Sequence, residues 1–572
     1  MTQTPFTAPA AGRFPPTSPA GVDRALATLR DHRRAWLDVP TTVKAGYLRG
    51  IAAAAIDTAP GFVADAVAAK GVPPELGSED WIATFVTVLR TVRILADSLE
   101  HVARSGGTLV TDSMVRTRDN GQAAIRVLPY DRWDKVLYAG YGAEVWVDPE
   151  VSRDRLAGHL GSIYTKPETA RPRTTAVLGA GNVAAIGILD VVYKLFNEGA
   201  VVVLKHNPVN DYVAPHVERI FAPLIRDGFL RIVLGGADVG QYLVHHPDVD
   251  EIHITGANRT HDTIVFGPGE EGAARKARGE PLLTKPVTSE LGNVSPVIVV
   301  PGRWSGPGLR LQAERVATQM VQNDGFNCNA AKVIVLSRDW GQKEDFLAEL
   351  RRVLLSLPER PAYYPGAEER FERFAGSHDD VELLGPRRPG FVPPALIKGV
   401  SPDFEHLAFT EEAFCSLAAT TELPGAPDEF LAAATAFCNE RLSGTLNATI
   451  LVDRQTRRAH HPALSRAVDD LRYGTVSVNV WGAAAFVLGS TVWGAFPGAT
   501  LEDVQSGIGF VRNALLVDRP QKSVMWAPFL TLKPPWLVTH RRSLPALRRA
   551  AEFEADPGLW RVLKVAAAAA RP

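Results

Sequence analysis

After a tail that is rich in Pro, Thr and Ala, the chain carries apolar residues at helical spacing. Three segments show this spacing, and they are residues 22–36, 42–55 and 78–99. A period of this kind places the apolar side chains on one face of a helix, which then packs against another layer. We expect the tail, residues 1–20, to be disordered.

The pattern becomes strand-like between residues 110 and 166. The runs AAIRVLPYD, DKVLYAG and GAEVWVDP are rich in residues that favour strands, and turn signals separate them. They predict paired strands within about 125–166. We interpret these strands as an arm that projects from the main body of the protein.

From residue 173 onward, short apolar runs alternate with helical patterns. The first series of runs is TTAVL, AVVVLK, LRIVLG and EIHITG, and the second includes SPVIVV, AKVIVL, TLNATILV and TVSVNV. Nearly continuous apolar strands that alternate with helices indicate parallel sheets covered on both faces. The pattern therefore predicts an α/β protein with two parallel-sheet domains.

Two segments interrupt this alternation. Residues 267–281 are charged and rich in glycine, and we expect a solvated loop there. Residues 474–500 contain no charged side chain and are long enough to span a membrane. Polar residues, Pro497 and the lack of basic flanking clusters favour a buried strand and loops beside a ligand cavity. After residue 513, an edge-like strand run precedes a basic helix and an Ala-rich end.

Composition narrows the class of protein. The 572 residues are 46% hydrophobic and 22% charged, with a formal net charge of −1. This length suggests two to four domains, and the near-neutral charge gives no support for a nucleic-acid partner. Three cysteines are too few for a disulfide framework or a four-thiolate metal site, and the N-terminus lacks the pattern of a signal peptide. We therefore expect a cytoplasmic protein without a metal site.

One cysteine, Cys328, stands in the run NDGFNCN, directly before a predicted strand. A free cysteine in a core normally has apolar neighbours, as Cys415 and Cys438 have, whereas one on a Gly/Asn-rich turn can present a thiolate to a ligand. A lone carboxylate, Glu290, stands upstream in the run SELGN. The pair is a candidate for a nucleophile and a base, although Glu290 alone could equally be a buried salt-bridge partner.

A glycine-containing turn, VLGAGNVA, follows the first strand of the α/β region and opens a helix. It includes Gly181 and Asn182 and fits the dinucleotide fingerprint, because glycines let the backbone approach a phosphate at a helix N-terminus. Asn182 alone could also be a helix N-cap. The next strand ends at Lys205 rather than at an acid. A lysine can donate to a ribose diol but cannot accept from it, so a variant mode of cofactor binding is expected.

Four further motifs accompany Asn182 and Lys205. They are ITGA at 254–257, ELG at 290–292, GFNC at 325–328 and EEAF at 411–414. In type and order the six resemble motifs of the aldehyde dehydrogenase superfamily, whose members have Phe-Thr-Gly-Ser, Glu-Leu-Gly-Gly, Gly-Gln-x-Cys and Glu-Glu-x-Phe at these places. The resemblance extends over about residues 20–515.

This resemblance implies a domain organisation. Residues 21–289 would form the dinucleotide-binding domain, and residues 290–510 the catalytic domain. The β arm would serve oligomerisation, which suggests a homodimer or homotetramer. Residues 511–572 would return to the cofactor domain or extend the oligomer interface.

The resemblance also implies an activity, the oxidation of an aldehyde to a carboxylic acid with NAD or NADP. Cys328 would attack the aldehyde, the Asn182 amide and the Cys328 N–H would form an oxyanion hole, and Glu290 would activate water to hydrolyse the thioester. Lys205 and Glu412 would hold ribose hydroxyls. The remaining cofactor-binding residues would be Gly181, Gly256, Ala257 and Phe414.

The chain departs from the family pattern at several places. Pro208 replaces a Glu or Ser that senses the adenosine ribose in many members, so the choice between NAD and NADP stays open. Asn293 replaces a glycine, and Cys415-Ser416 replaces Gly-Pro. Two other functions stay open, that of a CoA-acylating aldehyde dehydrogenase and that of a non-catalytic binding protein. The retained Glu290 favours hydrolysis of the thioester over its transfer to CoA.

Aromatic residues in the uncharged stretch give the only indication of the substrate. In this family the stretch borders the substrate entrance, and we expect an apolar or aromatic aldehyde, although core packing explains the same residues nearly as well. These residues are Trp481, Phe486, Trp493 and Phe496.

Overall fold

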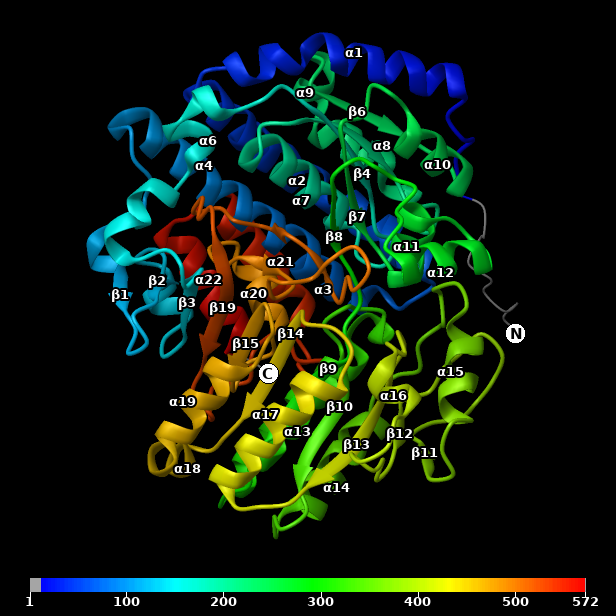
Figure 1. The fold of residues 1–572 in the computed structure, drawn as a ribbon. Helices are drawn as coiled ribbons and strands as arrows, with labels where there is room; N and C mark the ends of the chain where they lie inside the picture. Colours follow the sequence, from blue (N-terminus) through cyan, green and yellow to red (C-terminus); the bar gives the residue numbers. More distant parts are fainter. Residues whose placement is uncertain (1–11, 571–572) are drawn as a thin grey trace.

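The computed structural model describes residues 12–570 and contains two large β-sheets with helices packed around them (Figure 1). One sheet has six strands in the order β17-β8-β7-β4-β5-β6, and the other has eleven in the order β1-β2-β3-β19-β15-β14-β9-β10-β13-β12-β11. The central strands of both sheets run parallel. The predicted fold class, an α/β protein with two parallel-sheet domains, is confirmed.

The six-stranded sheet positions the glycine-containing turn. Its central strands, such as β4 and β5, are buried along their whole length, which explains their continuous apolar sequences. Its strands are β4 (Thr174–Leu178), β5 (Val201–Lys205), β6 (Leu230–Val233), β7 (Glu251–Thr255), β8 (Val287–Glu290) and β17 (Gly507–Ile508). Its helices are α7 (Ala185–Val192), α8 (Ala214–Ile220), α9 (Ala222–Arg226), α10 (Ala237–His245), α11 (Asn258–Phe266) and α12 (Gly269–Arg278).

An N-terminal helical layer covers this sheet, and it consists of α1 (Pro19–Asp38), α2 (Thr41–Lys70) and α4 (Thr87–Ser105). Within residues 12–570, α2 is the one helix long and apolar enough to cross a membrane by length and composition. It packs against α4 and α8, and Leu48 and Phe62 on it are fully buried. The core helix of a soluble protein meets the same criterion.

The eleven-stranded sheet carries the segment around Cys328. Its parallel strands are β9 (Ser295–Val299), β10 (Ala331–Ser337), β12 (Ala395–Ile397), β13 (Leu417–Leu423), β14 (Asn447–Leu451) and β15 (Thr475–Val478). Strand β19 (Pro520–Trp526) also runs parallel to β15, and it runs antiparallel to β3. The remaining strands are β1 (Val115–Thr117), β2 (Ala123–Leu128), β3 (Gly142–Val147) and β11 (Val381–Leu383). Its main helices are α13 (Gly306–Val321), α14 (Lys343–Leu355), α17 (Pro427–Arg441) and α19 (His461–Asp470).

The arm segment contains fewer strands than predicted. The run DKVLYAG begins as helix α5 (Asp134–Leu137), because Asp131 accepts hydrogen bonds from the backbone N–H groups of Trp133 and Asp134 and starts a helical turn. Strand β19 is not an edge, since it pairs with β3 on one side and β15 on the other. It ends at Trp526, and prolines after it remove the donors that a longer strand would need.

The prediction of a solvated loop at residues 267–281 is wrong, because most of this segment forms helix α12. Glu270 and Glu271 occupy its first turn, and three basic residues occupy its last turn, so the charges complement the helix dipole at both ends. Gly279 ends the helix in the left-handed conformation. Gly267 and Gly279 therefore flank the helix, and Gly272 lies inside it without interrupting it.

The tail and the uncharged stretch also differ in part from expectation. Residues 1–11 lie outside the described residues, but Thr17 exchanges hydrogen bonds with Leu234, and α1 already begins at Pro19. The stretch 474–500 forms β15, the short helix α20 (Ala483–Leu488) and β16 (Trp493–Gly494), which pairs with β18 (Phe510–Val511).

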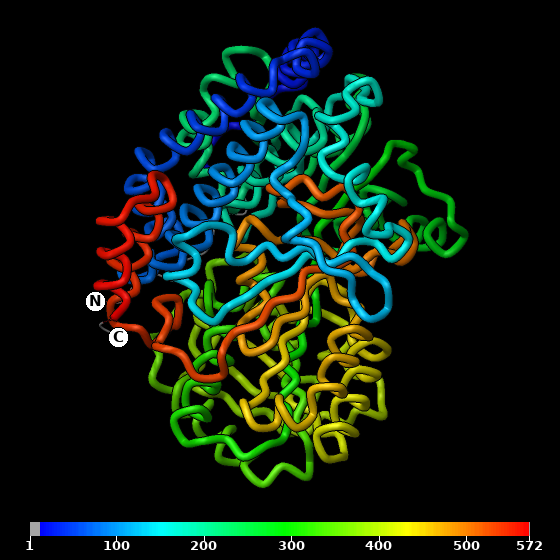
Figure 2. The backbone as a smooth tube through the Cα atoms, turned by 90° about the vertical axis from the view of Figure 1, so that its left-hand side faces the viewer, coloured from blue at the N-terminus to red at the C-terminus, as the bar shows by residue number. Residues whose placement is uncertain are grey.

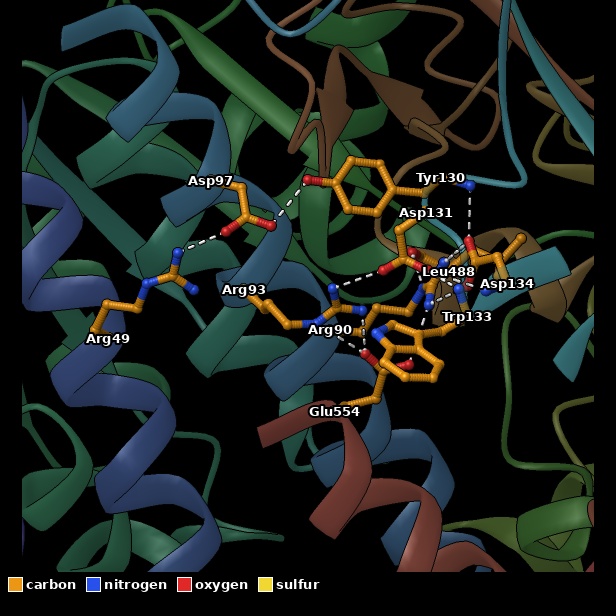
Figure 3. A network of polar contacts seen from close by, with 10 residues as sticks. All are labelled: Arg49, Arg90, Arg93, Asp97, Tyr130, Asp131, Trp133, Asp134, Leu488 and Glu554. Atoms are coloured by element: carbon orange, nitrogen blue, oxygen red, sulfur yellow. Dashed lines mark hydrogen bonds and ion pairs between the residues drawn. The ribbon is translucent and has the colours of Figure 1, made fainter. Parts of the chain in front are cut away.

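The C-terminal segment returns to the N-terminal helices. Helix α21 (Ser543–Ala555) packs on α2 and α4, and α22 (Leu559–Ala569) packs on α21 (Figure 2). A buried ion network joins these parts (Figure 3): Glu554 binds Arg90 and Arg93 on α4 at 3.0 and 2.6 Å. Arg90 also binds Asp134 at 2.7 Å and the Leu488 carbonyl oxygen at 2.7 Å. One network thus connects the C-terminal helix, the arm and α20.

Candidate active site

A cleft of about 770 Å³ lies at the carboxyl ends of β4, β5, β7 and β8. Ligands of open parallel sheets bind at this edge, because loops from neighbouring strands converge there. All the site residues expected from the sequence line this cleft: Gly181, Asn182, Lys205, Gly256, Ala257, Glu290, Cys328, Glu412 and Phe414.

The turn before β10 holds Cys328 in a constrained backbone. Asn323, Asp324 and Gly325 have φ angles of 52°, 53° and 71°, all in the left-handed region. A Cβ on Gly325 would lie 2.5 Å from the carbonyl carbon of Cys415, so only glycine fits against that backbone. Left-handed residues in succession are costly and cluster at functional sites. The turn leaves Cys328 partly exposed to the cleft.

The Cys328 thiol donates a hydrogen bond to Oε1 of Glu290 at 3.5 Å. Burial, followed by the nearby charges of Glu290 and Glu412, raises the pKa of the Cys328 thiol well above its ordinary value. The site therefore does not present a ready thiolate. It provides an adjacent base that can take the proton when the sulfur reacts.

Glu290 ends strand β8 with its side chain buried. The Trp493 indole N–H donates to Oε1 at 2.7 Å, and Nη1 of Arg512 lies 4.0 Å from Oε2. Burial raises the pKa of Glu290, whereas Arg512 opposes that rise. A carboxylate whose pKa lies above its ordinary value is a stronger base, as proton abstraction from a thiol or water requires.

Asn182 lies in the turn between β4 and α7, three residues before the helix begins and not at its N-cap, Ala184. Its Nδ2 donates to the carbonyl oxygen of Phe326 at 2.8 Å, two residues from Cys328. A carboxamide nitrogen carries two hydrogens, so the second remains for an oxyanion. The backbone N–H of Cys328 donates to no acceptor within residues 12–570. An oxyanion hole is built from two such free donors, which makes this pair its candidate.

The other end of the cleft offers groups suited to a dinucleotide. Lys205 is 8% exposed and forms no ion pair within the described chain, and desolvation lowers its pKa to about 8. A Cβ on Gly181 would lie 2.8 Å from Oδ1 of Asn207, so a larger residue in the turn after β4 would displace the Asn207 side chain. Gly256 and Ala257 precede the N-terminus of α11, where free backbone N–H groups favour phosphate.

Glu412 and Phe414 close the cleft from the second sheet. Burial raises the pKa of Glu412 to about 7, and its Oε1 is buried without a hydrogen-bond partner in residues 12–570. An unpaired buried oxygen is costly unless a ligand satisfies it. Phe414 has a φ of 44° and packs edge-on against Tyr364 at 5.0 Å between ring centroids.

The four aromatic residues of the uncharged stretch lie outside this cleft. Trp481 is buried and donates to the Asn329 carbonyl oxygen at 2.7 Å, and Trp493 binds Glu290 instead of facing an entrance. Phe486 is buried beneath Arg512, while Phe496 lines a separate pocket. None of the four lines this cleft, and the expectation of an apolar or aromatic aldehyde stays a prediction.

Two contacts of Glu290 could not be found from motifs. Trp493 and Arg512 are distant from it in sequence, and neither belongs to a recognisable pattern. Within residues 12–570, no group of three or more His, Cys, Asp or Glu side chains is arranged to hold a metal ion.

Fold and site together define an α/β protein with a cysteine and a carboxylate in contact at the carboxyl edge of a parallel sheet. Residues 184–362 match the model of the Aldehyde dehydrogenase family. The chain is 27% identical over 300 residues to an aminoacetaldehyde dehydrogenase of Pseudomonas aeruginosa, a match that covers 50% of this chain and 55% of that relative. The match thus spans about half the length of the curated relative.

Solved structures share the fold over nearly the whole chain. An aldehyde dehydrogenase of Mycobacterium tuberculosis complexed with NAD+ superimposes with a TM-score of 0.62 at 19% identity, covering 91% of this chain and 93% of that one. An NADP-dependent glyceraldehyde-3-phosphate dehydrogenase of Bacillus halodurans complexed with NADP gives 0.60 at 16% identity, with coverages of 90% and 92%. These findings confirm the resemblance to the aldehyde dehydrogenase superfamily.

Proposed function

We propose that the protein oxidises an aldehyde to a carboxylic acid with NAD+ or NADP+, through a thioester on Cys328. The observation that carries this proposal is the 3.5 Å contact between the Cys328 sulfur and Glu290, inside a cleft large enough for a dinucleotide. The aldehyde dehydrogenase relatives, and the NAD+ and NADP complexes among the similar structures, support it.

The residues of the cleft fit a nicotinamide dinucleotide. Lys205 offers an ammonium group without an ion pair in the described chain, and Glu412 offers an unpaired carboxylate oxygen, so the two can donate to and accept from ribose hydroxyls. When bound, the oxidised nicotinamide supplies the hydride acceptor. Pro208 carries no charge, so the choice between NAD+ and NADP+ stays open.

The side chains of the site account for the covalent steps. Glu290 takes the thiol proton as the sulfur of Cys328 bonds to the aldehyde carbon, and the resulting alkoxide receives hydrogen bonds from Asn182 and the Cys328 N–H. One such donor is worth about 3 kcal/mol of transition-state stabilisation. Loss of hydride from the carbon leaves a thioester. Glu290 releases the thiol proton to solvent and then takes a proton from water, while the water oxygen bonds to the acyl carbon. The carbon–sulfur bond breaks, and the leaving sulfur takes the proton back from Glu290.

Over the full cycle one aldehyde, one water and one oxidised cofactor give one carboxylic acid, one reduced cofactor and one proton. The close contact of Glu290 with Cys328 favours water as the acyl acceptor. A CoA-acylating enzyme is the alternative, and it must keep water from the thioester. Three free cysteines within the described chain also agree with a reducing cytoplasm, which we propose as its location.

Variants of the two central residues test this proposal. Cys328→Ala should abolish aldehyde oxidation while cofactor binding survives. Glu290→Gln should still form one equivalent of reduced cofactor in a burst, at a lower burst rate because the thiol has lost its base, and should then turn over slowly. Cys438→Ala, at a buried cysteine outside the cleft, is the matched control and should retain activity. Continued turnover by Cys328→Ala refutes the mechanism. Release accelerated by CoA rather than by water establishes the acylating alternative.

A further inference from the structure

Arg512 is a fully buried arginine without a hydrogen bond in the described chain. It follows strand β18, its side chain has 0% relative exposure, and none of its three guanidinium nitrogens has a partner. Its φ of 57° lies in the left-handed region, which arginine rarely adopts. A buried charge normally has partners, so this arrangement requires a reason.

Other buried arginines of this protein are satisfied differently. Arg90 binds two carboxylates and a carbonyl oxygen, and Arg315 donates to the Asn479 carbonyl oxygen at 2.7 Å and to Thr531 at 2.8 Å. Arg512 instead lies flat over the Phe486 ring, with Cζ 3.3 Å from the ring centroid. The contact fixes the guanidinium in place and leaves its N–H groups free.

The free N–H groups lie beside the free oxygen of Glu290. Nη1 of Arg512 is 4.0 Å from Oε2, and Oε2 has no hydrogen-bond partner in residues 12–570. The other oxygen, Oε1, accepts from both Trp493 and Cys328. The two oxygens thus have separate neighbours, and an approach of about 0.8 Å would bring Oε2 into hydrogen-bond distance of Arg512.

The remaining charged groups around Glu290 do not replace this cation. Asp190 on α7 is a second buried carboxylate and disfavours a charge on Glu290. His253 on β7 faces Asp190, with Nε2 3.6 Å from Oδ2. The Cys328 thiol becomes a like charge when it ionises. Arg512 is therefore the permanent cation that faces Glu290.

We propose that Arg512 is a positioning residue that keeps Glu290 anionic and holds its Oε2, so that Oε1 stays directed at the Cys328 sulfur. This inference rests on the proposed function, since it assigns the control of thioester hydrolysis. In that step Glu290 accepts the proton of water, the water oxygen bonds to the acyl carbon, and sulfur leaves as thiolate; no electrons are exchanged. Without the cation, the pKa of Glu290 rises further, and a smaller fraction of Glu290 can accept that proton.

Neutral substitutions test this role. Arg512→Met and Arg512→Gln should shift the acidic limb of the steady-state pH profile upward by roughly 1 to 3 pH units, the effect of an opposite charge at this distance. At any pH on that limb, each pH unit of upward shift should lower the steady-state rate about ten-fold. The first-turnover burst should keep its amplitude. Arg512→Lys, which retains a cation, should restore part of the shift.

A matched control separates this role from a structural one. Arg315→Met also removes a buried guanidinium, but away from Glu290, and should lower stability without moving the acidic limb. Two results would overturn the proposal. In one, the neutral Arg512 variant that folds has its acidic limb at the same pH as the wild type. In the other, Arg315→Met moves the acidic limb by the same amount as the Arg512 variants.

An activated ester makes the test independent of the aldehyde. p-Nitrophenyl acetate acylates a reactive cysteine without any cofactor, and release of acetate then depends on Glu290. Slower acetate release in Arg512→Met, with an unchanged nitrophenolate burst, supports the role of Arg512 even if no aldehyde is oxidised. Absence of aldehyde oxidation in the wild type would instead contradict the proposed function alone.

Discussion

Glu554→Gln should detach the C-terminal helix α21 from the rest of the protein. The Glu554 side chain is 3% exposed and accepts hydrogen bonds from Arg90 at 3.0 Å and from Arg93 at 2.6 Å. The substitution keeps the size of the side chain and removes its charge. Two buried guanidinium groups then lose a counter-ion that no water can replace.

The loss can be apportioned from the contacts. Breaking a buried ion pair by removing one partner costs about 3–5 kcal/mol. Arg90 keeps Asp134 at 2.7 Å and the Leu488 carbonyl oxygen at 2.7 Å, whereas Arg93 keeps only Asp131 at 3.1 Å. The cost therefore falls mainly on Arg93, and we expect the lower end of that range, about 3 kcal/mol.

Glu552→Gln is the matched control on the same helix. Glu552 is 44% exposed and pairs with Arg548 at 3.3 Å, one turn away on the surface. Exposed pairs of this kind are worth about 0–1 kcal/mol. Its loss should leave α21 in place.

Hydrogen exchange measures the effect where it occurs. Amides of residues 543–569 should exchange more than about 100-fold faster in Glu554→Gln than in the wild type, since 1.4 kcal/mol corresponds to a factor of ten. Exchange in Glu552→Gln should stay within about five-fold of the wild type. Equal exchange in both variants would show that the buried network does not hold the helix.

Three further predictions concern the site. Trp493→Phe removes the 2.7 Å hydrogen bond to Glu290, and a hydrogen bond to a charged group is worth about 1.5–3 kcal/mol. The raised pKa of Glu290 should therefore rise further and move the acidic limb of turnover to higher pH. An acidic limb at the pH of the wild type would contradict this expectation. Desolvation lowers the pKa of Lys205 to about 8, so its ammonium form is lost above that pH. The cofactor KM of the wild type should rise above that pH. In Lys205→Ala the cofactor KM should exceed that of the wild type at lower pH and should show no such rise. Gly325→Ala places a Cβ 2.5 Å from facing backbone, whereas a Cβ on Gly399, which has a similar φ of 65°, meets no atom within 4 Å. Rapid-mixing measurement of the burst should show slower acylation in Gly325→Ala and a normal rate in Gly399→Ala. Equal rates would refute the role of this close approach.

The chemical motifs could be found in the sequence because each is local. The cysteine turn at Gly325–Cys328 and the lysine at the end of β5 depend on a few adjacent residues, and the alternation of apolar strands and helices orders them along two sheets. The carboxyl ends of parallel strands lie at one edge of the sheet, which is why Lys205 and Glu290 both line the cleft at that edge. The roles of these residues remain predictions.

The support of Glu290 could not be predicted in the same way. Trp493 lies in an uncharged stretch where an aromatic side chain suits an entrance and a core equally well. Arg512 carries no motif and reaches Glu290 only because β17 pairs with β8. At 267–281, the glycines favoured a loop, while the charge distribution that stabilises α12 was the stronger signal. Long-range pairing and helix-end charges decide these cases.

The most direct test of the account is the mass of the peptide that contains Cys328. Glu290→Gln protein, mixed with an aldehyde that the wild type oxidises and with oxidised cofactor, should accumulate an acyl group on the Cys328 sulfur, in proportion to the reduced cofactor formed. The same treatment of Cys328→Ala should leave every peptide unmodified. Two results would contradict the account. One is reduced cofactor formed by Glu290→Gln without an acyl group on Cys328, and the other is reduced cofactor formed by Cys328→Ala.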